Sequence, residues 1–453
     1  MKKTFLCSLM LATAISGSAN AQNIFEALSQ AYETNPTLQA QRAYLRAVDE
    51  NVAIAKSGYR PTVSVNGNYT DTNTDVKNSV GNPDGSQYAY SAKISQPLFN
   101  GLQTVNSVKS ADSMVLSEQN NLYNVEQTVF IDASTAYLDV VQNKAIVDLQ
   151  KNNEKLLKKR LDETVQRFNV GEVTRTDVSQ ARARYARAKA DRISSEGTLE
   201  ASKAVYAKII GVAPVDVKAP EGEIDKFLPK TPEEALEYAK AHNYSIRQAK
   251  NYFDSKDYDV KTNTGALLPQ VSLDGVASRT RNYTDNISGV KEQDDLEWSV
   301  NMSIPLYEGG ETRAKIRQSK YQKWQAQEQV LEAERLVTSN VTSAWEYMVA
   351  NKAMITSIKE QVRANEIALD GVQKEEALGN RTILDVLDAY QELLNSNVEE
   401  VKARRNYYVS AMTLLQAMGR LTARDLGLNV ELYNAEKYSA ETRNKWLSLS
   451  IDK

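Results

Sequence analysis

Few side chains in this 453-residue sequence are of the types that catalyse reactions or bind transition metals. His242 is the only histidine and Cys7 the only cysteine. Zinc and iron sites need several nitrogen or sulfur ligands, and a serine or cysteine nucleophile needs a base beside it. A lone histidine in a helical segment is usually a surface or packing residue. We therefore expect no enzyme, no cofactor and no resident metal ion.

Two carboxylates in the last quarter of the chain have a spacing that suits cations. Asp385 and Asp388 are three residues apart, so on a helix they share one face. Repeated around a symmetric oligomer, they would form two carboxylate rings, which favour cations and bind divalent ions in conducting pores. The alternative is that Asp385 only caps its helix and that Asp388 is a solvated surface residue.

The N-terminus has the pattern of a secretory signal peptide, which we place at residues 1–21. A basic start at Lys2 precedes an apolar run, and a small-residue cleavage site ends at Ala21. Cleavage removes Cys7, so the mature protein is expected to lie outside the cytoplasm without disulfides. The net charge of −3 comes from mixed acidic and basic residues, which gives no basic patch for nucleic acid.

The rest of the chain contains two copies of one unit. A shift of 208 positions aligns Ser95–Gly101 with Ser303–Gly309, Gly171 with Gly379, and Gly211 with Gly419. We therefore expect repeat 1 at residues 22–211, a proline-rich linker at 212–232, repeat 2 at 233–419 and a C-terminal tail at 420–453.

Each repeat is predicted to fold as a helix, a β-hairpin, a very long helix, a tight turn and a return helix. Residues 102–170 contain no Gly or Pro, and their apolar residues follow a near-heptad spacing typical of a coiled coil. The predicted elements are opening helices at 24–57 and 232–264, hairpins at 62–96 and 270–304, long helices at 102–170 and 311–378, and return helices at 174–210 and 382–418.

The hairpins alternate apolar and polar residues, which predicts strands with one apolar and one polar face. The polar face includes Lys93, Asp274 and Glu297, as a water-filled lumen would. After the signal peptide no apolar run approaches the roughly 18 residues of a membrane helix, so membrane insertion would require a closed barrel. Three chains would supply twelve strands, whereas the eight strands of two chains enclose only side chains. The alternative is a small sheet packed on the helices.

The two predicted turns share the residues that a tight turn between two helices requires. Gly171 and Gly379 end the long helices, where a left-handed residue is preferred. Thr174 with Asp177, and Thr382 with Asp385, resemble the capping boxes that start the next helices. Elsewhere the turns differ: Glu376 replaces Phe168, Arg381 replaces Val173, and Asp388 replaces Gln180.

Together these features resemble the TolC family of outer-membrane channels over essentially the whole mature chain. The resemblance is carried by the duplication, by the paired Pro-Leu-aromatic-x-Gly motifs at Pro97–Gly101 and Pro305–Gly309, and by the two turns. It implies an α plus transmembrane β fold. Three copies would form a 12-stranded β-barrel continuous with a 12-helix periplasmic α-barrel, with an equatorial belt from the linker and the tail.

The resemblance also implies a function: a passive exit duct in the outer membrane of a Gram-negative cell, extending into the periplasm. The duct would belong to a tripartite efflux pump or a type I secretion system. Its partners would be a periplasmic adaptor and an inner-membrane RND or ABC transporter, and its cargo drugs, other small molecules or unfolded proteins. The turn residues Gly171, Thr174, Gly379 and Thr382 would form the docking surface for the adaptor.

The resemblance assigns roles at the entrance as well. Asp385 and Asp388 match the family's constricting aspartates, while Arg381, Thr176 and Asp177 match links that hold the entrance helices shut. Glu376 stands where the family usually has a tyrosine, and we expect it to pair with Arg381. An arginine–carboxylate pair suits a latch because it is directional.

Two other functions compete with the duct. A periplasmic coiled-coil adaptor or scaffold without a pore would need no alternating strands and would dissolve without detergent. An envelope hydrolase would need a nucleophile and base, which the sequence does not provide.

Overall fold

The computed structural model describes residues 23–73, 85–220, 222–284, 292–443, 445–446 and 448–450. The expected signal peptide at 1–21 lies outside these residues. None of the described helices combines the length and the apolarity needed to cross a membrane.

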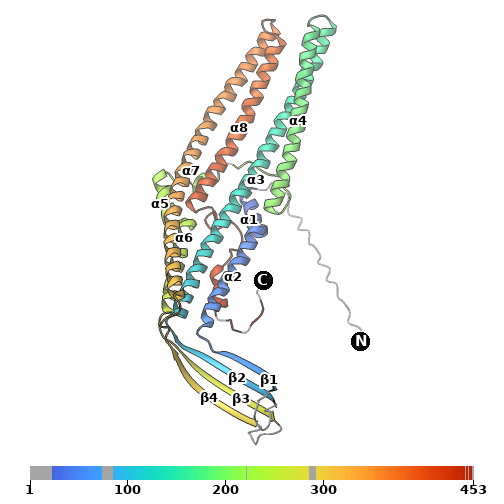
Figure 1. Ribbon diagram of the computed structural model, residues 1–453. Helices are drawn as coiled ribbons and strands as arrows, with labels where there is room; N and C mark the ends of the chain where they lie inside the picture. The colour runs from blue at the N-terminus through green and yellow to red at the C-terminus, as the bar shows by residue number, and fades with distance from the viewer. Residues whose placement is uncertain are drawn as a thin grey trace, which may run out of the picture. The chain divides into compact units, whose positions relative to one another are not determined.

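Both repeats fold into the same order of elements (Figure 1). Repeat 1 contains α1 (Ile24–Thr34), α2 (Pro36–Ser57), β1 (Thr62–Thr72), β2 (Gly85–Asn100), α3 (Gln103–Asn169) and α4 (Arg175–Ile210). Repeat 2 contains α5 (Pro232–His242), α6 (Tyr244–Gly265), β3 (Gln270–Thr284), β4 (Glu292–Ser303), α7 (Glu311–Ala377) and α8 (Ile383–Met418). The linker adds the short 3-10 helix η1 (Asp225–Phe227), and the tail adds α9 (Ala435–Thr442).

Each predicted opening helix is in fact two helices, broken at equivalent asparagines. Asn35 has extended backbone angles, as the residue before Pro36 must, and its side chain donates to the Ile209 carbonyl at 2.8 Å. Asn243 is extended too, and its side chain accepts the Ser245 N–H at 2.8 Å. Each asparagine thus ends one helix and starts the next.

The chain divides into two compact units that do not coincide with the two repeats. Unit 1 comprises the chain up to Thr37 with Glu126–Leu236 and Asn340–Glu431, and unit 2 comprises Leu38–Val125, Glu237–Ser339 and Leu432–Lys453. Each unit takes corresponding segments from both repeats, because α3 and α7 are long enough to contribute to both.

Unit 1 has an apolar interior formed by helices from both repeats. Phe130 and Tyr137 of α3, Tyr206 of α4 and Leu415 of α8 are fully buried. The Tyr137 hydroxyl donates to the Lys218 carbonyl at 2.7 Å, which holds the linker against α3. Burial of large side chains of this kind contributes about 1.5–3 kcal/mol each to stability.

Unit 2 carries the strands, and none of its described helices covers the sheet. All four strands form one antiparallel sheet in the order β1-β2-β3-β4, so the two predicted hairpins are joined through β2 and β3. Every residue of β1 is exposed, and Val65 and Leu296 are 77% and 73% exposed. The alternative of a sheet packed on the helices is therefore wrong, and one chain leaves an apolar face open to its surroundings.

The opposite face of the sheet is polar. Lys93 lies 3.9 Å from Asp274, whose carboxylate also accepts a hydrogen bond from Asn301 at 2.7 Å. The register places Glu297 on this same face. The two faces of the sheet therefore suit two different environments, one apolar and one aqueous.

Candidate functional site

The candidate site is the pair of turns at the ends of α3 and α7, which belong to unit 1 and lie at the same end of it (Figure 1). In the first turn, Gly171 has a φ of +82°, and its N–H donates to the Phe168 carbonyl at 3.0 Å. Thr174 Oγ1 accepts the Asp177 N–H at 3.2 Å, and the Asp177 carboxylate accepts the Thr174 N–H at 2.8 Å. This reciprocal pair is a capping box.

The second turn repeats this geometry. Gly379 has a φ of +79°, and its N–H donates to the Glu376 carbonyl at 2.9 Å. Thr382 Oγ1 accepts the Asp385 N–H at 3.2 Å, and the Asp385 carboxylate accepts the Thr382 N–H at 2.9 Å. A Cβ added at either turn glycine would meet no atom within 4 Å, so the positive φ rather than crowding requires glycine.

The two capping aspartates share an electrostatic environment. The backbone N–H and hydroxyl of Thr174 lower the pKa of Asp177, and those of Thr382 lower the pKa of Asp385. Both carboxylates therefore stay ionised near neutral pH. Asp385 does cap its helix, as the simpler alternative holds, and in doing so it keeps a negative charge at a fixed place on the turn.

Near the turns, two ion pairs of the described residues connect the first hairpin, α3–α4, to the second, α7–α8. Arg167 Nη1 lies 2.6 Å from Glu376 Oε1, and Arg184 of α4 pairs with Asp388 of α8. Asp388 is 54% exposed, as the simpler alternative holds, and it pairs with Arg184 as well. Both pairs run from a basic residue of repeat 1 to an acidic residue of repeat 2.

Further contacts lie behind these ion pairs. Arg160 Nη2 donates to the Tyr390 hydroxyl at 3.2 Å. Leu157, Ala188 and Leu387 form a buried apolar cluster that joins α3, α4 and α8. The two hairpins are therefore held together by apolar contact as well as by charge.

The expected pair of Glu376 with Arg381 is wrong. Arg381 Nε instead bonds Glu375 Oε2 at 2.8 Å, within its own turn. The Glu376 side chain is only 13% exposed and faces Arg167, whereas Glu375 is 51% exposed on the open side of the turn. Thr176 lies exposed in the first turn of α4. The structure therefore groups Asp177 with Thr174 and Arg381 with Glu375, as contacts within single turns.

The parts of the two hairpins near the turns differ sharply in charge. Residues 151–192 contain twelve Lys or Arg and six Asp or Glu, whereas the equivalent residues 359–400 contain four and ten. Much of this charge is on the surface: the side chains of Lys159 and Arg187 are 80% and 71% exposed, and those of Asp370 and Asp388 are 64% and 54% exposed. The same fold thus presents a basic turn region in repeat 1 and an acidic turn region in repeat 2.

Sequence reasoning missed Arg167 and Arg184, the basic partners of the two ion pairs. A signal was present, because the 208-residue shift aligns them with Glu375 and Glu392. At both positions repeat 1 has arginine where repeat 2 has glutamate. A search for such charge inversions between the repeats would have found both residues.

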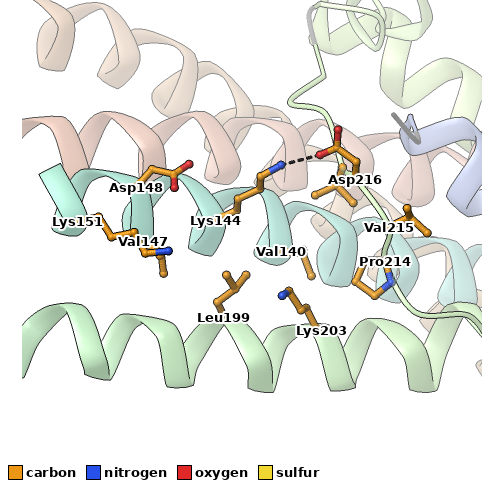
Figure 2. A pocket seen from close by; sticks show the side chains of 11 residues that line it. Val140, Lys144, Val147, Asp148, Lys151, Leu199, Lys203, Pro214, Val215 and Asp216 are labelled. Carbon is orange, nitrogen blue, oxygen red and sulfur yellow. Dashed lines mark hydrogen bonds and ion pairs between the residues drawn. The ribbon is translucent and has the colours of Figure 1, made fainter. Parts of the chain in front are cut away.

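Unit 1 also contains a half-open pocket between α3, α4 and the linker (Figure 2). Its volume is about 240 Å³, and Lys144 forms an ion pair with Asp216 at 2.7 Å across one side. No serine, threonine, cysteine or histidine lines it. Among the described residues there is no group of three His, Cys, Asp or Glu that could hold a metal ion.

Comparison with known proteins identifies both repeats. The family model described as "Outer membrane efflux protein" matches residues 27–212 and again residues 235–420. The outer membrane efflux protein BepC of Brucella suis is 35% identical over 448 residues, which are 97% of this chain and 95% of BepC. The outer membrane protein TolC of Escherichia coli is 26% identical over 439 residues, which are 94% of this chain and 88% of TolC.

The fold resembles that of solved channels. The crystal structure of the CmeC outer membrane channel of Campylobacter jejuni superposes with a TM-score of 0.77 at 13% identity. The match covers 93% of this chain and 89% of CmeC, so it includes the helices and the sheet alike.

Proposed function

Because the chain belongs to the family of outer membrane efflux proteins, the TolC family, we propose that three copies of it form one exit duct. The protein is a channel of the Gram-negative outer membrane that extends into the periplasm, and it is not an enzyme. Channels of this family work with adaptors and inner-membrane transporters in efflux and secretion.

The observation that carries the trimer is the sheet with two open edges. β1 and β4 are the outer strands of the sheet in one chain. Strand edges with unpaired N–H and C=O groups cannot face lipid. Joining β4 of each copy to β1 of the next gives a closed barrel of twelve antiparallel strands, wide enough for a lumen. The apolar face then contacts lipid, and the face with Lys93, Asp274 and Glu297 lines the lumen.

The same three copies supply the periplasmic part of the duct. Helices α3, α4, α7 and α8 of each copy contribute to a 12-helix α-barrel. The linker at 212–232 and the tail at 420–453 form a belt around it. A conduit of this kind needs no catalytic residues, because the transported molecule is moved by the energy of the inner-membrane transporter.

The entrance of the duct lies at the two turns. Asp385 and Asp388 of three copies form two carboxylate rings that select cations and bind divalent ions. Asp385 supplies a fixed charge because it caps its helix, and Asp388 is partly neutralised by Arg184 while the hairpins are together. Separation of the hairpins breaks the Arg167–Glu376 and Arg184–Asp388 pairs and opens the entrance. Arg381, Thr176 and Asp177 support the closed turns.

The partners dock at this same end. Gly171, Thr174, Gly379 and Thr382 form the surface on which a periplasmic adaptor binds, and the adaptor connects the duct to an inner-membrane RND or ABC transporter. The exported cargo is a drug or another small molecule, or an unfolded secreted protein, according to the transporter that docks.

Native mass spectrometry of the purified mature protein in detergent tests this proposal. The expected species has the mass of three chains and requires detergent to stay in solution. A single chain that is soluble without detergent would contradict the duct and support the scaffold instead.

A further inference from the structure

The apolar face of the sheet ends abruptly toward the loop ends of the strands. The register of β3 and β4 places four apolar rows in succession: Val271 with Met302, Leu273 with Val300, Gly275 with Trp298, and Ala277 with Leu296. The next two rows on the same face are Arg279 with Asp294 and Arg281 with Glu292. We call these four charged residues the rim ladder.

The rim ladder is a set of exposed arginine–carboxylate pairs. Arg279 Nε and Nη2 donate to the two Asp294 oxygens, each at 2.6 Å. Arg281 Nε and Nη2 donate to Glu292 Oε1 at 3.1 and 3.0 Å. The four side chains are 46–60% exposed. A guanidinium has five N–H donors, so each arginine keeps three for another acceptor.

Tyrosines occupy the same rows on the neighbouring strands. Tyr90 lies opposite Arg279 and Tyr88 opposite Arg281. The rings of Tyr69 and Tyr283 lie 4.8 and 5.8 Å from that of Tyr88. Girdles of such amphipathic aromatic rings mark the membrane–water boundaries of membrane barrels.

Charge on a lipid-facing position is tolerated only near such a boundary, because its cost falls toward zero away from the bilayer midplane. Within the described strands the basic side chains are Lys93 on the polar face and the two arginines on the apolar face. Both arginines thus sit where the apolar face meets the headgroup layer.

We propose that Arg279 and Arg281 bind the phosphate of a phosphorylated lipid headgroup at the outer boundary of the membrane. This inference rests on the proposed function, because it requires the apolar face to contact lipid. The planar guanidinium suits phosphate oxygens, and the tyrosine hydroxyls add donors beside it. Asp294 and Glu292 hold the arginines in a fixed orientation. They also offset the positive charge of the arginines, so they weaken phosphate binding.

Trp298 provides a reporter, since it lies on the apolar face two rows from Asp294 and is 63% exposed. The other tryptophans, Trp324, Trp345 and Trp446, are replaced by Phe. The trimer is reconstituted in vesicles of phosphatidylcholine with increasing phosphatidic acid, and one of the two lipids carries brominated acyl chains. Quenching of Trp298 then gives the relative affinity of the rim for the two lipids.

We expect phosphatidic acid to be preferred about fivefold, the equivalent of about 1 kcal/mol, because Asp294 and Glu292 offset part of the attraction of the two arginines for a charged headgroup. The preference is expected to vanish in Arg279→Gln/Arg281→Gln and to increase in Asp294→Asn/Glu292→Gln. Lys93→Gln, on the opposite face, is the matched control and is expected to keep the preference of the parent protein.

Each contrary result has its own meaning. Equal quenching by the two brominated lipids in the parent protein, or an unchanged preference without the arginines, would overturn the lipid site and leave the duct intact. Absence of quenching by either lipid would overturn both, because Trp298 would then lie outside the bilayer. A preference lost equally in Lys93→Gln would show a general charge effect and would contradict a site at the rim ladder.

Discussion

Hairpin α3–α4 and hairpin α7–α8 have the same backbone, but their turn-proximal parts, residues 151–192 and 359–400, have opposite net charge. Their turn glycines, capping threonines and capping aspartates occupy equivalent positions. Yet near the turn the first hairpin has an excess of basic residues and the second an excess of acidic ones. The shared residues are those that a tight helix–turn–helix backbone requires. The residues that differ make the ion pairs between the hairpins and supply Asp388, one of the two carboxylates that we place at the entrance.

The largest expected effect comes from removing the two carboxylates that form the proposed rings. Asp385→Ala/Asp388→Ala is expected to abolish the block of channel current by divalent cations, because both carboxylate rings disappear. Asp177→Ala is the matched control, since it removes the equivalent cap from the first turn and leaves the rings in place. Single-channel recording with added Mg²⁺ or Co²⁺ measures the block. If Asp177→Ala loses the block equally, Asp385 acts only as a helix cap.

A smaller effect is expected from the ion pair between the hairpins. Glu376→Gln removes the partner of Arg167 on the other hairpin and leaves its pair with Glu172, and it is expected to raise the open probability about fivefold, the equivalent of about 1 kcal/mol for a partly exposed pair. Arg381→Ala breaks a pair within one turn and is expected to raise it less. If the Arg381 variant opens the channel more than the Glu376 variant does, the Arg167–Glu376 pair is not the contact that keeps the entrance closed.

The two turn glycines test whether the backbones of the two turns are equivalent. Gly171→Ala and Gly379→Ala each force a left-handed alanine and are expected to cost about 1 kcal/mol. Their apparent unfolding temperatures in detergent should fall by similar small amounts, because the two φ values are nearly equal. A large difference between the two variants would show that the turns are not equivalent in the assembled protein.

The smallest effect is expected from mild acidification. The folded-state pKa of Asp177 and of Asp385 is lowered by the capping threonines, so the stability that each cap contributes is present above the ordinary aspartate pKa, about 4. It is lost as the pH falls through the lowered value. Between pH 7 and pH 5 the apparent unfolding temperatures of the parent protein and of Asp177→Ala should therefore differ by a constant amount. A difference that shrinks already at pH 6 would contradict the lowered pKa.

Much of the fold could be predicted from sequence because its signals are local or repeated. The absence of Gly and Pro from residues 102–170 predicts a helix that the structure places at Gln103–Asn169. In each turn the Gly marks the end of the long helix and the Thr marks the start of the return helix. The predicted helix ends agree with the structure to within one residue. The 208-residue shift also shows that whatever one repeat forms, the other forms as well.

The remaining features depend on contacts that local patterns do not specify. The junction of β2 with β3 joins strands of different repeats, and the residue pattern of neither strand indicates which strand it pairs with. The partner of Glu376 depends on which side of α7 faces α3, and the helix packing decides this. The breaks at Asn35 and Asn243 are an exception, because Asn35 precedes Pro36 and the 208-residue shift places Asn243 at the equivalent position.

Reversal potentials of the purified protein in a planar bilayer test whether three copies form a cation-selective duct. Under a KCl gradient the account predicts discrete single-channel currents whose reversal potential lies toward that of K⁺, because carboxylates from three copies line the entrance. Discrete currents that favour Cl⁻, or a purified protein that forms no channels, would contradict it.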